Sequence, residues 1–414
     1  MPTPDLPVLA AETSLLSQKF GPETANYFSG SPLNRLSFLR TDHAFLKPAF
    51  SHPSASFLLL DNLAPMVQGS DNANLAFATT EDVLPLTGVD PFGKSEEELI
   101  ASFNSEESHP LMVFLGIDDK GVLRTHEGVT EEFTFRDFKG TPFFALDITP
   151  REKNAEEAKS LKKKMEERGY VFQGNSPRHL GLHAGQAAMY GHARALIDWN
   201  TRTPFCAQCG QPTLSVNAGT KRVCPPTDSV SGTPVERKPC ATRGTVSNHS
   251  FPRTDPTVIM AIVSADGSKI LLGRQKRWPP YWYSTLAGFQ EPGESIEEAV
   301  RREVWEESGV TVGRVVLHSS QPWPFPASLM IGAVGQAVGG DGEKIFLGHD
   351  AELESAKWFP MEEVKEALRL GTSNLGEGPP EGYKEGALRL PPQTAIANRL
   401  INSVVEGGWL SSKM

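Results

Sequence analysis

Short apolar runs, each bounded by turn-forming residues, predict strands in two separate parts of the chain. The first set lies between Tyr27 and Pro150, at residues 56–61, 111–118 and 143–148, and is typical of a β-rich domain. The second set begins after Pro256 and covers residues 258–263, 269–272, 312–318, 329–338 and 356–359. The pattern therefore predicts at least two regions that contain strands.

Apolar residues at helical spacing predict helices between and after these strands. The predicted helices cover residues 151–168, 183–199, 295–308, 361–370 and 393–405. Gly309 directly follows one of them and is predicted to be its C-cap. Residues 288–293 contain glycine and proline and are expected to form a loop. Residues 371–386 are rich in Gly, Pro and Glu and are expected to form a flexible insertion.

Composition narrows the class of protein. A chain of 414 residues is too long for one ordinary core, so two or three domains are expected. The formal net charge of -10 argues against a protein that mainly grips nucleic-acid backbone. No stretch approaches the roughly 20 apolar residues that span a bilayer, and a secretory signal is not expected, because the N-terminus lacks a basic region and an apolar core.

Three carboxylates gather on the predicted helix 295–308. Glu306 is three residues from Glu303, and Glu307 is four, so all three share one helical face. Like charges so placed repel one another, and a cluster beside a glycine-containing loop suggests a cation between them; an amphipathic surface helix is the simpler alternative. Hard oxygen ligands favour Mg²⁺ or Mn²⁺. Arg302 is placed to neutralise and orient a neighbouring carboxylate, for which Glu294 is the candidate.

The complete pattern from Gly288 to Val310 is G-x5-E-x7-R-E-U-x-E-E-x-G-U, where U is apolar. It resembles the Nudix box, the signature of hydrolases that act on nucleoside diphosphates linked to another group. The resemblance implies a loop-helix-loop that binds divalent metal through Glu303, Glu306 and Glu307, with the backbone carbonyl of Ala287 as a further ligand. Arg302 and Glu294 complete the implied catalytic set.

A proline-aromatic segment follows the box at Ser320-Gln-Pro-Trp-Pro-Phe-Pro-Ala-Ser328. Its prolines predict a stiff, extended stretch that presents its two rings at defined angles; a peptide ligand or a structural loop are the alternatives. The segment is similar to the S-Q-P-W-P-F-P-x-S array of NADH pyrophosphatases within the Nudix superfamily. The resemblance implies that the substrate contacts Gln321, Pro322, Trp323, Pro324, Phe325, Pro326, Ala327 and Ser328.

Four more positions are similar to that family. Phe289 is implied to stack on a base, and Phe251 stands where the family has a tyrosine, so a ring is kept but its hydroxyl is lost. Glu352 corresponds to a glutamate that supplies a late metal ligand, with Glu354 as the alternative register. Ala397, on the closing helix, is implied to line the nucleotide site.

All four cysteines lie in one short stretch, as Cys206, Cys209, Cys224 and Cys240. Clustered cysteines in an intracellular chain point to metal rather than to disulfides. A C-x-x-C knuckle with two further thiolates suits tetrahedral, structural Zn²⁺, and the second pair is split by an insertion similar to that in fungal members of the family. His249 is the alternative to Cys240 as fourth ligand.

Together these features predict an α+β chain in which a β-rich Nudix-like N-terminal domain and a zinc ribbon precede a Nudix α/β/α sandwich. The expected parts are a weakly structured stretch (1–26), an N-terminal α+β domain (27–182), a helix and zinc ribbon (183–256), a Nudix domain (257–409, with 371–388 as the insertion) and a tail (410–414). The implied reaction is metal-dependent hydrolysis of NADH, and also of NAD⁺ and related dinucleotides, to NMNH or NMN plus AMP.

Two other functions stay open at this point. The same chemistry could remove NAD caps from RNA 5′ ends, and a binding-only Nudix fold is the alternative from a different class. The last residues, Ser412-Lys-Met414, resemble a C-terminal peroxisomal address, which would make an import receptor a partner. The resemblance also implies a homodimer, with the ribbon near its interface.

Overall fold

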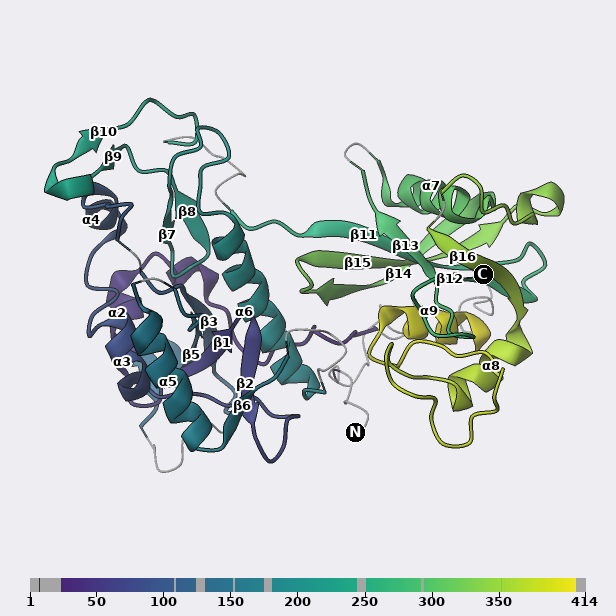
Figure 1. Cartoon of the computed structure of the whole chain (residues 1–414), viewed down its shortest axis with the longest axis horizontal. Coiled ribbons are helices and arrows are strands. Elements are labelled where there is room, and N and C mark those ends of the chain that lie inside the picture. The colour runs from purple at the N-terminus through teal and green to yellow at the C-terminus, as the bar shows by residue number, and fades with distance from the viewer. Residues whose placement is uncertain are drawn as a thin grey trace. The chain divides into compact units, whose positions relative to one another are not determined.

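Figure 1 shows the computed structural model of the chain, which forms two units, each built around its own sheet. The structure describes residues 7, 24–107, 109–123, 131–151, 153–174, 181–243, 251–291, 294–350 and 352–406. Unit 1 comprises the described parts of Ser31–Arg253 together with Pro324–Pro326, and unit 2 comprises 24–30, Thr254–Trp323 and 327–406. No helix among the described residues is both long and apolar enough to cross a membrane.

Unit 1 is a sheet with the order β3-β5-β1-β2-β6 and with β4 beside β5. Its strands are β1 (Ser56–Asp61), β2 (Ala64–Gln68), β3 (Met112–Asp118), β4 (Phe133–Phe135), β5 (Phe138–Asp147) and β6 (Tyr170–Phe172). Its helices are η1 (Ser37–Leu39), α2 (His43–Ser51), α3 (Thr80–Thr87), α4 (Glu96–Ala101), α5 (Ala155–Glu167) and α6 (Ala184–Arg202). β1 and β5 run parallel, and the other neighbours along this path are antiparallel.

Every residue of β1 is buried, because helices cover both faces of the sheet. Phe57 and Leu59 belong to an aromatic-rich core that also contains Phe45 of α2, Val83 of α3 and Leu161 of α5. The long α6 contacts β3 and β5 and covers the other face (Figure 1). The unit is therefore mixed α+β, which confirms the fold class expected for this domain, and the β-rich region of the strand pattern also contains helices.

The ribbon follows α6 within unit 1. It consists of two short antiparallel hairpins, one formed by β7 (Leu214–Val216) and β8 (Lys221–Val223), the other by β9 (Thr227–Asp228) and β10 (Val235–Glu236). A 3₁₀ turn, η3 (Val230–Gly232), joins β9 to β10.

Unit 2 is a sheet with the order β14-β15-β11-β12-β16 and with β13 beside β11. Its strands are β11 (Asp255–Val263), β12 (Lys269–Gln275), β13 (Leu286–Phe289), β14 (Val312–Trp323), β15 (Ser328–Ala337) and β16 (Leu353–Pro360). Its helices are α7 (Ile296–Ser308), η5 (Gly340–Glu343), α8 (Met361–Leu370) and α9 (Ile396–Val405). β11 and β15 run parallel.

From Val258 to Val263 the central strand β11 is apolar and buried, as expected for a strand that is covered on both faces. Val258, Met260 and Ile262 belong to the core that contains Val300 and Val304 of α7. The alternate residues Ile259, Ala261 and Val263 belong to a second core, with Val364 of α8 and Leu400 and Ile401 of α9. Figure 1 shows α7 on one side of this sheet and α8 and α9 on the other, which confirms the predicted sandwich.

Several predicted elements need correction. Gly288 and Phe289 are not in a loop but end strand β13, which pairs with β11. The proline-aromatic segment is not one extended stretch: it is the end of β14, a turn and the start of β15, with Trp323 paired to Ser328. The first helix of the pattern begins at Ala155 and the last at Ile396, each later than predicted.

The proposed insertion 371–388 is joined at its base to ordered structure. The Gly371 N–H donates to the Ala367 carbonyl at 2.7 Å, and the Leu390 N–H donates to the Gly371 carbonyl at 3.1 Å. Leu388 and Leu390 are buried in the core beneath the sheet. Both ends of this segment are therefore held by unit 2.

Candidate active site

Helix α7 has well-defined ends. Ser295 caps its N-terminus in a reciprocal capping box: the Ser295 side chain accepts from the Glu298 N–H at 3.2 Å, and Glu298 Oε2 accepts from the Ser295 N–H at 2.7 Å. Gly309 ends the helix in the left-handed region at φ 73°, where glycine is favoured because it lacks a Cβ. The predicted helix and its C-cap are thus confirmed.

Arg302 is the centre of a charged network at the start of the site. Its Nε donates to Glu294 Oε1 at 2.6 Å and its Nη2 to Glu294 Oε2 at 2.9 Å, so the pair is bidentate. Its Nη1 reaches Glu303 Oε1 and Glu306 Oε2, both at 2.9 Å. The hydrogen bonds from Arg302 lower the pKa of Glu294 to about 2. The same pair has the reverse effect on Arg302: its hydrogen bonds to Glu294 are the main cause that raises the pKa of the guanidinium.

Glu307 has a different environment from these neighbours. Its side chain is buried, with the residue only 3% exposed, and its Oε2 has no hydrogen-bond partner. Burial, and after it the negative charge of Glu352, raise the pKa of Glu307 to about 9. Burial also raises the pKa of Glu303. A buried carboxylate oxygen without a partner costs free energy, so a cation is expected to bind here.

Strand β13 brings backbone close to the carboxylates. A Cβ placed on Gly288 would lie 2.0 Å from the carboxyl carbon of Glu303, so a larger residue here would require the Glu303 carboxylate to move. The preceding Ala287 is paired with Ile259 on β11. Phe289 ends the strand, and its carbonyl accepts from Arg302 Nη2 at 2.8 Å, which ties β13 to α7.

The structure distinguishes between the two candidate late glutamates. After burial, the negative charge of Glu352 contributes to the raised pKa of both Glu307 and Glu303; its carboxylate accepts from Gln275 Nε2 at 2.7 Å. Glu354 instead forms an ion pair with Arg274. Of the two, Glu352 is the one whose charge acts on Glu303 and Glu307, and its place among the metal ligands stays a prediction.

These residues fit a divalent metal ion. The unpartnered Oε2 of Glu307 is a hard oxygen donor, and Glu303 and Glu352 carry negative charge beside it. Glu306 and Glu307 also lie in the last turn of α7, which holds no basic residue, and the negative end of the helix dipole disfavours acids there. A bound cation would offset both effects. Oxygen-only donors suit Mg²⁺ or Mn²⁺ better than softer metals.

Gln321 of the proline-aromatic segment lies inside unit 2 and is only 1% exposed. Its Nε2 donates to the carbonyls of Tyr27, at 3.0 Å, and Thr394, at 2.8 Å. Its Oε1 accepts from the Ile396 N–H at 2.9 Å. The amide of Gln321 therefore connects β14 to the start of α9 and to the segment 24–30.

The rest of the segment is divided between the two units. Pro322 and Trp323 end β14, and the Trp323 ring meets Phe28 edge-on, with 6.1 Å between the centroids. Pro324, Phe325 and Pro326 belong to unit 1, where Arg194 donates to the Pro324 carbonyl and its guanidinium lies 4.4 Å from the Phe325 ring centroid. Ala327 and Ser328 are buried at the start of β15.

The remaining predicted contacts differ in exposure. Phe289 is 60% exposed at the end of β13. Phe251 is 45% exposed but belongs to unit 1. Ala397 is buried in the core beneath the sheet of unit 2.

The segment 24–30 was not among the residues predicted to belong to the site. Asn26, Tyr27 and Phe28 are all buried in unit 2. Asn26 Nδ2 donates to Ser319 Oγ at 3.0 Å and to the Ser320 carbonyl at 2.9 Å. Partners nearly three hundred positions away leave no local pattern, although the N-terminal aromatic pair was available as a hint.

The four cysteines form a compact cluster in the ribbon. Their sulfur atoms all lie within 4.8 Å of one another, with Cys206 Sγ 3.7 Å from Cys240 Sγ and Cys209 Sγ 3.6 Å from Cys224 Sγ. Tetrahedral Zn²⁺ with Zn–S bonds near 2.3 Å separates its sulfurs by about 3.8 Å. The thiolates therefore fit zinc, and Cys240 lies within the set. His249 is outside the described residues.

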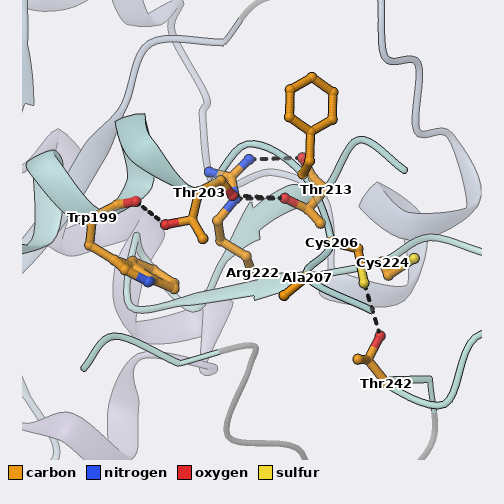
Figure 2. Close-up of a pocket in the computed structure, with 9 residues that line it drawn as sticks. Trp199, Thr203, Cys206, Ala207, Thr213, Arg222, Cys224 and Thr242 are labelled. Atoms are coloured by element: carbon orange, nitrogen blue, oxygen red, sulfur yellow. Dashed lines mark hydrogen bonds between the residues drawn. The ribbon is translucent and has the colours of Figure 1, made fainter. Parts of the chain in front are cut away.

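Polar groups surround the cysteine sulfurs. The Thr242 hydroxyl lies 3.1 Å from Cys240 Sγ and 3.6 Å from Cys206 Sγ, a contact drawn in Figure 2. Arg243 Nη2 donates to Cys224 Sγ at 3.4 Å. Figure 2 also shows Arg222 beside Thr213, to which its Nε donates at 2.7 Å. These contacts lie within the ribbon, and Arg222 Nη1 also donates to Asn200 Oδ1 of α6 at 3.0 Å, which ties the ribbon to that helix.

Comparisons with known proteins match three consecutive parts of the chain. Residues 54–199 match the NADH pyrophosphatase-like rudimentary NUDIX domain, residues 201–238 the NADH pyrophosphatase zinc ribbon domain, and residues 253–376 the NUDIX domain. The zinc-ribbon match ends just before Cys240, which the structure places with the other three thiols.

Three relatives illustrate the similarity. The NAD-capped RNA hydrolase of Schizosaccharomyces pombe is 33% identical over 393 residues, covering 94% of this chain and 95% of that protein. The NAD-capped RNA hydrolase NPY1 of Saccharomyces cerevisiae is 34% identical, covering 92% and 95%. The mitochondrial NAD(P)H pyrophosphatase NUDT13 of Mus musculus is 37% identical over 272 residues, covering 65% and 70%.

Proposed function

Because this chain belongs to the NADH pyrophosphatase type of Nudix hydrolases, we propose that it hydrolyses the pyrophosphate bond of NADH to NMNH and AMP with Mg²⁺ or Mn²⁺. NAD⁺ and related dinucleotides are poorer substrates of the same site. The observation that carries this proposal is the buried, unpartnered Oε2 of Glu307 beside Glu303 and Glu352.

The metal-binding residues would be Glu303, Glu306, Glu307 and Glu352, with the carbonyl of Ala287. When bound, the metal lowers the pKa of a water molecule and neutralises charge on the phosphate oxygens. Arg302 holds Glu303 and Glu306 at fixed positions by hydrogen bonds, which orients their free oxygens before substrate arrives.

Hydrolysis joins the oxygen of water to one phosphorus and breaks the bond from that phosphorus to the bridging oxygen. The bridging oxygen leaves with the other phosphate, and a carboxylate of the cluster accepts the proton of the water. Both products are monophosphates, so no external acid, oxidant or reductant is required.

Two aromatic residues of unit 2, Phe289 and Trp323, favour a nucleotide substrate. The exposed ring of Phe289 follows Gly288 directly and offers a face for stacking. Trp323 lies at the end of β14, and we propose that the turn after it also contacts the substrate. Gln321 would position the end of β14 without touching the substrate, since its amide is hydrogen-bonded to backbone groups.

Product analysis tests the proposal directly. NADH incubated with the zinc-loaded protein and Mg²⁺ or Mn²⁺ should yield NMNH and AMP in equal amounts, resolved by chromatography. Reaction in ¹⁸O-labelled water places the label in the monophosphate whose phosphorus was attacked. Intact NADH after prolonged incubation with either metal would overturn the proposal.

Removal of NAD caps from RNA is the second candidate, because two relatives that cover over nine-tenths of this chain are named NAD-capped RNA hydrolases. The chemistry at the pyrophosphate is the same. A single mixture of NADH and NAD-capped RNA separates the two: the preferred substrate is the one with the larger kcat/KM under competition.

We also propose a structural Zn²⁺ held by the four cysteines, a homodimer, and import into peroxisomes through Ser412-Lys-Met414. The tail lies outside the described residues. A fluorescent fusion at the N-terminus should form puncta that coincide with a peroxisomal marker and should disperse when Lys413 and Met414 are deleted. Sedimentation equilibrium measures the oligomeric state.

A further inference from the structure

The segment 24–30 is attached to strand β14 at consecutive residues. Asn26 Nδ2 donates to Ser319 Oγ at 3.0 Å and to the carbonyl of the next residue at 2.9 Å. Gln321 Nε2 donates to the Tyr27 carbonyl at 3.0 Å. Asn26 and Gln321 are each only 1% exposed, and breaking a buried hydrogen bond is costly because it leaves its groups without partners. The segment is therefore held firmly against β14.

An aromatic contact continues this attachment at the end of the strand. The buried ring of Phe28 meets Trp323 edge-on, with 6.1 Å between the centroids and 84° between the planes. On the same segment, the Tyr27 ring lies 4.7 Å from that of Phe28. Such pairs are favoured because the positive edge of one ring faces the negative face of the other. Trp323 is itself half-buried, so the Phe28 ring limits the orientations that its side chain can adopt.

The contacts with the segment follow one face of β14. Ser319, Gln321 and Trp323 are alternate residues, and the strand pairs regularly with β15 from Ser319 to Trp323. Side chains at alternate positions of a strand point to the same face of the sheet. The three side chains that meet the segment 24–30 therefore form one row, and this row ends at Trp323.

The backbone of Phe28 indicates that its ring is what this position requires. Its φ is 69°, in the left-handed region where glycine is favoured and a bulky side chain is strained. Residues persist in such conformations only where the surrounding structure fixes them. The contacts of the Phe28 ring must therefore offset a strain that glycine would avoid.

Trp323 is one of the residues that the proposed function assigns to the substrate. We propose that Phe28 is a positioning residue for Trp323, and that the segment 24–30 holds the Trp323 ring in the orientation that receives a planar ring of the dinucleotide. This inference rests on the proposed function and deepens it. It adds to the substrate site a residue that lies outside all three segments matching known domains.

A segment that merely covers apolar surface is the simpler explanation. Covering a surface requires no directional bonds, yet the segment 24–30 makes hydrogen bonds to three consecutive residues of β14, 319–321, before its ring meets Trp323. Both explanations predict a loss of stability when the Phe28 ring is removed. Only positioning predicts weaker substrate binding together with normal turnover of the substrate once it is bound.

Binding of NADH without catalytic metal is the direct test. NADH is titrated into the full-length, zinc-loaded protein in buffer free of Mg²⁺ and Mn²⁺, and its nicotinamide fluorescence is followed. Phe28→Leu keeps an apolar side chain but removes the ring, and it should raise the Kd roughly two- to tenfold, the range for one edge-on aromatic contact. With Mg²⁺ present, KM should rise by the same factor while kcat is retained.

Phe359→Leu is the matched control. Phe359 is buried in the core beneath the sheet of unit 2 and meets Tyr283 edge-on at 5.0 Å, so the variant loses the same kind of contact away from β14. It should lower the melting temperature, as Phe28→Leu does, and bind NADH like the wild type. Two results would overturn the proposal: a wild-type Kd for Phe28→Leu, or an equal rise in Kd for both variants.

A double variant tests whether Phe28 acts through Trp323. Combining Phe28→Leu with Trp323→Leu should weaken NADH binding no further than Trp323→Leu alone, because the ring that Phe28 positions is then absent. Additive losses would show that Phe28 acts elsewhere and would overturn the proposal.

Fluorine NMR tests the same contact without any substrate. The protein is labelled with 5-fluorotryptophan, and the signal of Trp323 is assigned from its loss in Trp323→Phe. That signal should shift and broaden in Phe28→Leu, where the ring is no longer held, and should stay unchanged in Phe359→Leu. An unchanged signal in Phe28→Leu would overturn the proposal.

These outcomes are separable from failure of the proposed function. If wild-type protein cleaves NADH while Phe28→Leu keeps the wild-type Kd and KM, only the role of Phe28 falls. If wild-type protein binds NADH without cleaving it and Phe28→Leu weakens that binding, the positioning role stands and the reaction is wrong. If wild-type protein neither binds nor cleaves NADH, the proposed function falls, and with it the role of Phe28 toward that substrate.

Discussion

The two sheets of this protein pair their strands in the same way. Helix α3 in unit 1 and helix α7 in unit 2 differ in how their buried acids are neutralised. In unit 1, β1 pairs antiparallel with β2 and parallel with β5; in unit 2, β11 pairs antiparallel with β12 and parallel with β15. Each outer strand also has its counterpart in the orders β3-β5-β1-β2-β6 and β14-β15-β11-β12-β16.

The resemblance extends to the strand before the helix. Phe57 on β1 bridges antiparallel to Ala78, just before α3, as Val258 on β11 pairs with Gly288, before α7. The carboxylates that follow have opposite surroundings. Hydrogen bonds from Arg168 and Lys164 outweigh the burial of Asp82 on α3 and lower its pKa to about 2, whereas Glu307 on α7 has no cation and its pKa is raised to about 9.

This contrast teaches that the fold alone does not produce a metal site. Asp82 is neutralised by two cations of the protein itself, with Lys164 Nζ at 2.7 Å and Arg168 Nη1 at 2.8 Å. On α7, Arg302 is shared among Glu294, Glu303 and Glu306, and among the described residues no Lys or Arg forms an ion pair with Glu307. Function follows from which acids the sequence leaves unpaired.

The largest effect is expected from Glu303→Gln. Loss of one metal-binding charge removes several kcal/mol of transition-state stabilisation, so kcat for NADH should fall roughly a thousandfold or more. The melting temperature should stay near that of the wild type, because Gln fills the same volume. Steady-state kinetics with thermal unfolding checks both; near-normal turnover would remove Glu303 from the site.

The next effect is expected from Gly288→Ala. The added methyl would meet the Glu303 carboxyl carbon and displace that side chain, so turnover should fall roughly a hundredfold, as for other small displacements of catalytic groups. Ala78→Gly, at the position that pairs with β1, is the control and should leave turnover unchanged. Equal activities of Gly288→Ala and wild type would show that Glu303 does not need its present position.

Asp82→Asn should act in the opposite way, on stability and not on activity. It removes the charge that binds Arg168 and Lys164 and weakens the capping box with Thr79. The free energy of unfolding should fall by about 1–3 kcal/mol, measured by urea denaturation, while kcat for NADH is retained. A loss of turnover without a loss of stability would contradict the contrast between the two helices.

The sequence predicted α7 almost residue by residue because its signals are local: the capping serine, the apolar spacing and the terminal glycine all lie within a few turns. The pair of Arg302 and Glu294 was likewise foreseen from spacing. The strand β13 was not, because Gly288 and Phe289 are in a strand only through their partners on β11. Gln321 was expected to contact substrate, yet its amide is satisfied by Tyr27 and Thr394, contacts that depend on the tertiary fold and leave no trace in a local pattern.

The two helices are compared most directly by their dependence on pH. The pKa of Asp82 lies below its ordinary value of 3.8, so its contribution to stability is present above that pH and is lost as pH falls toward 2. The pKa of Glu307 lies above its ordinary value of 4.5. The folded state therefore prefers its protonated form, and stability without Mg²⁺ or Mn²⁺ should decline as pH rises from 4.5 toward 9. Denaturant titrations of zinc-loaded protein should show this decline, and Glu307→Gln should abolish it.

Because a carboxylate must lose its proton to bind a metal, Mn²⁺ addition near neutral pH should release about one proton from the wild type and less from Glu307→Gln. Calorimetry in buffers of different ionisation enthalpy measures that release. Equal values for the two proteins would mean that Glu307 is already ionised, as Asp82 is, and that the buried acids of the two helices do not differ in protonation.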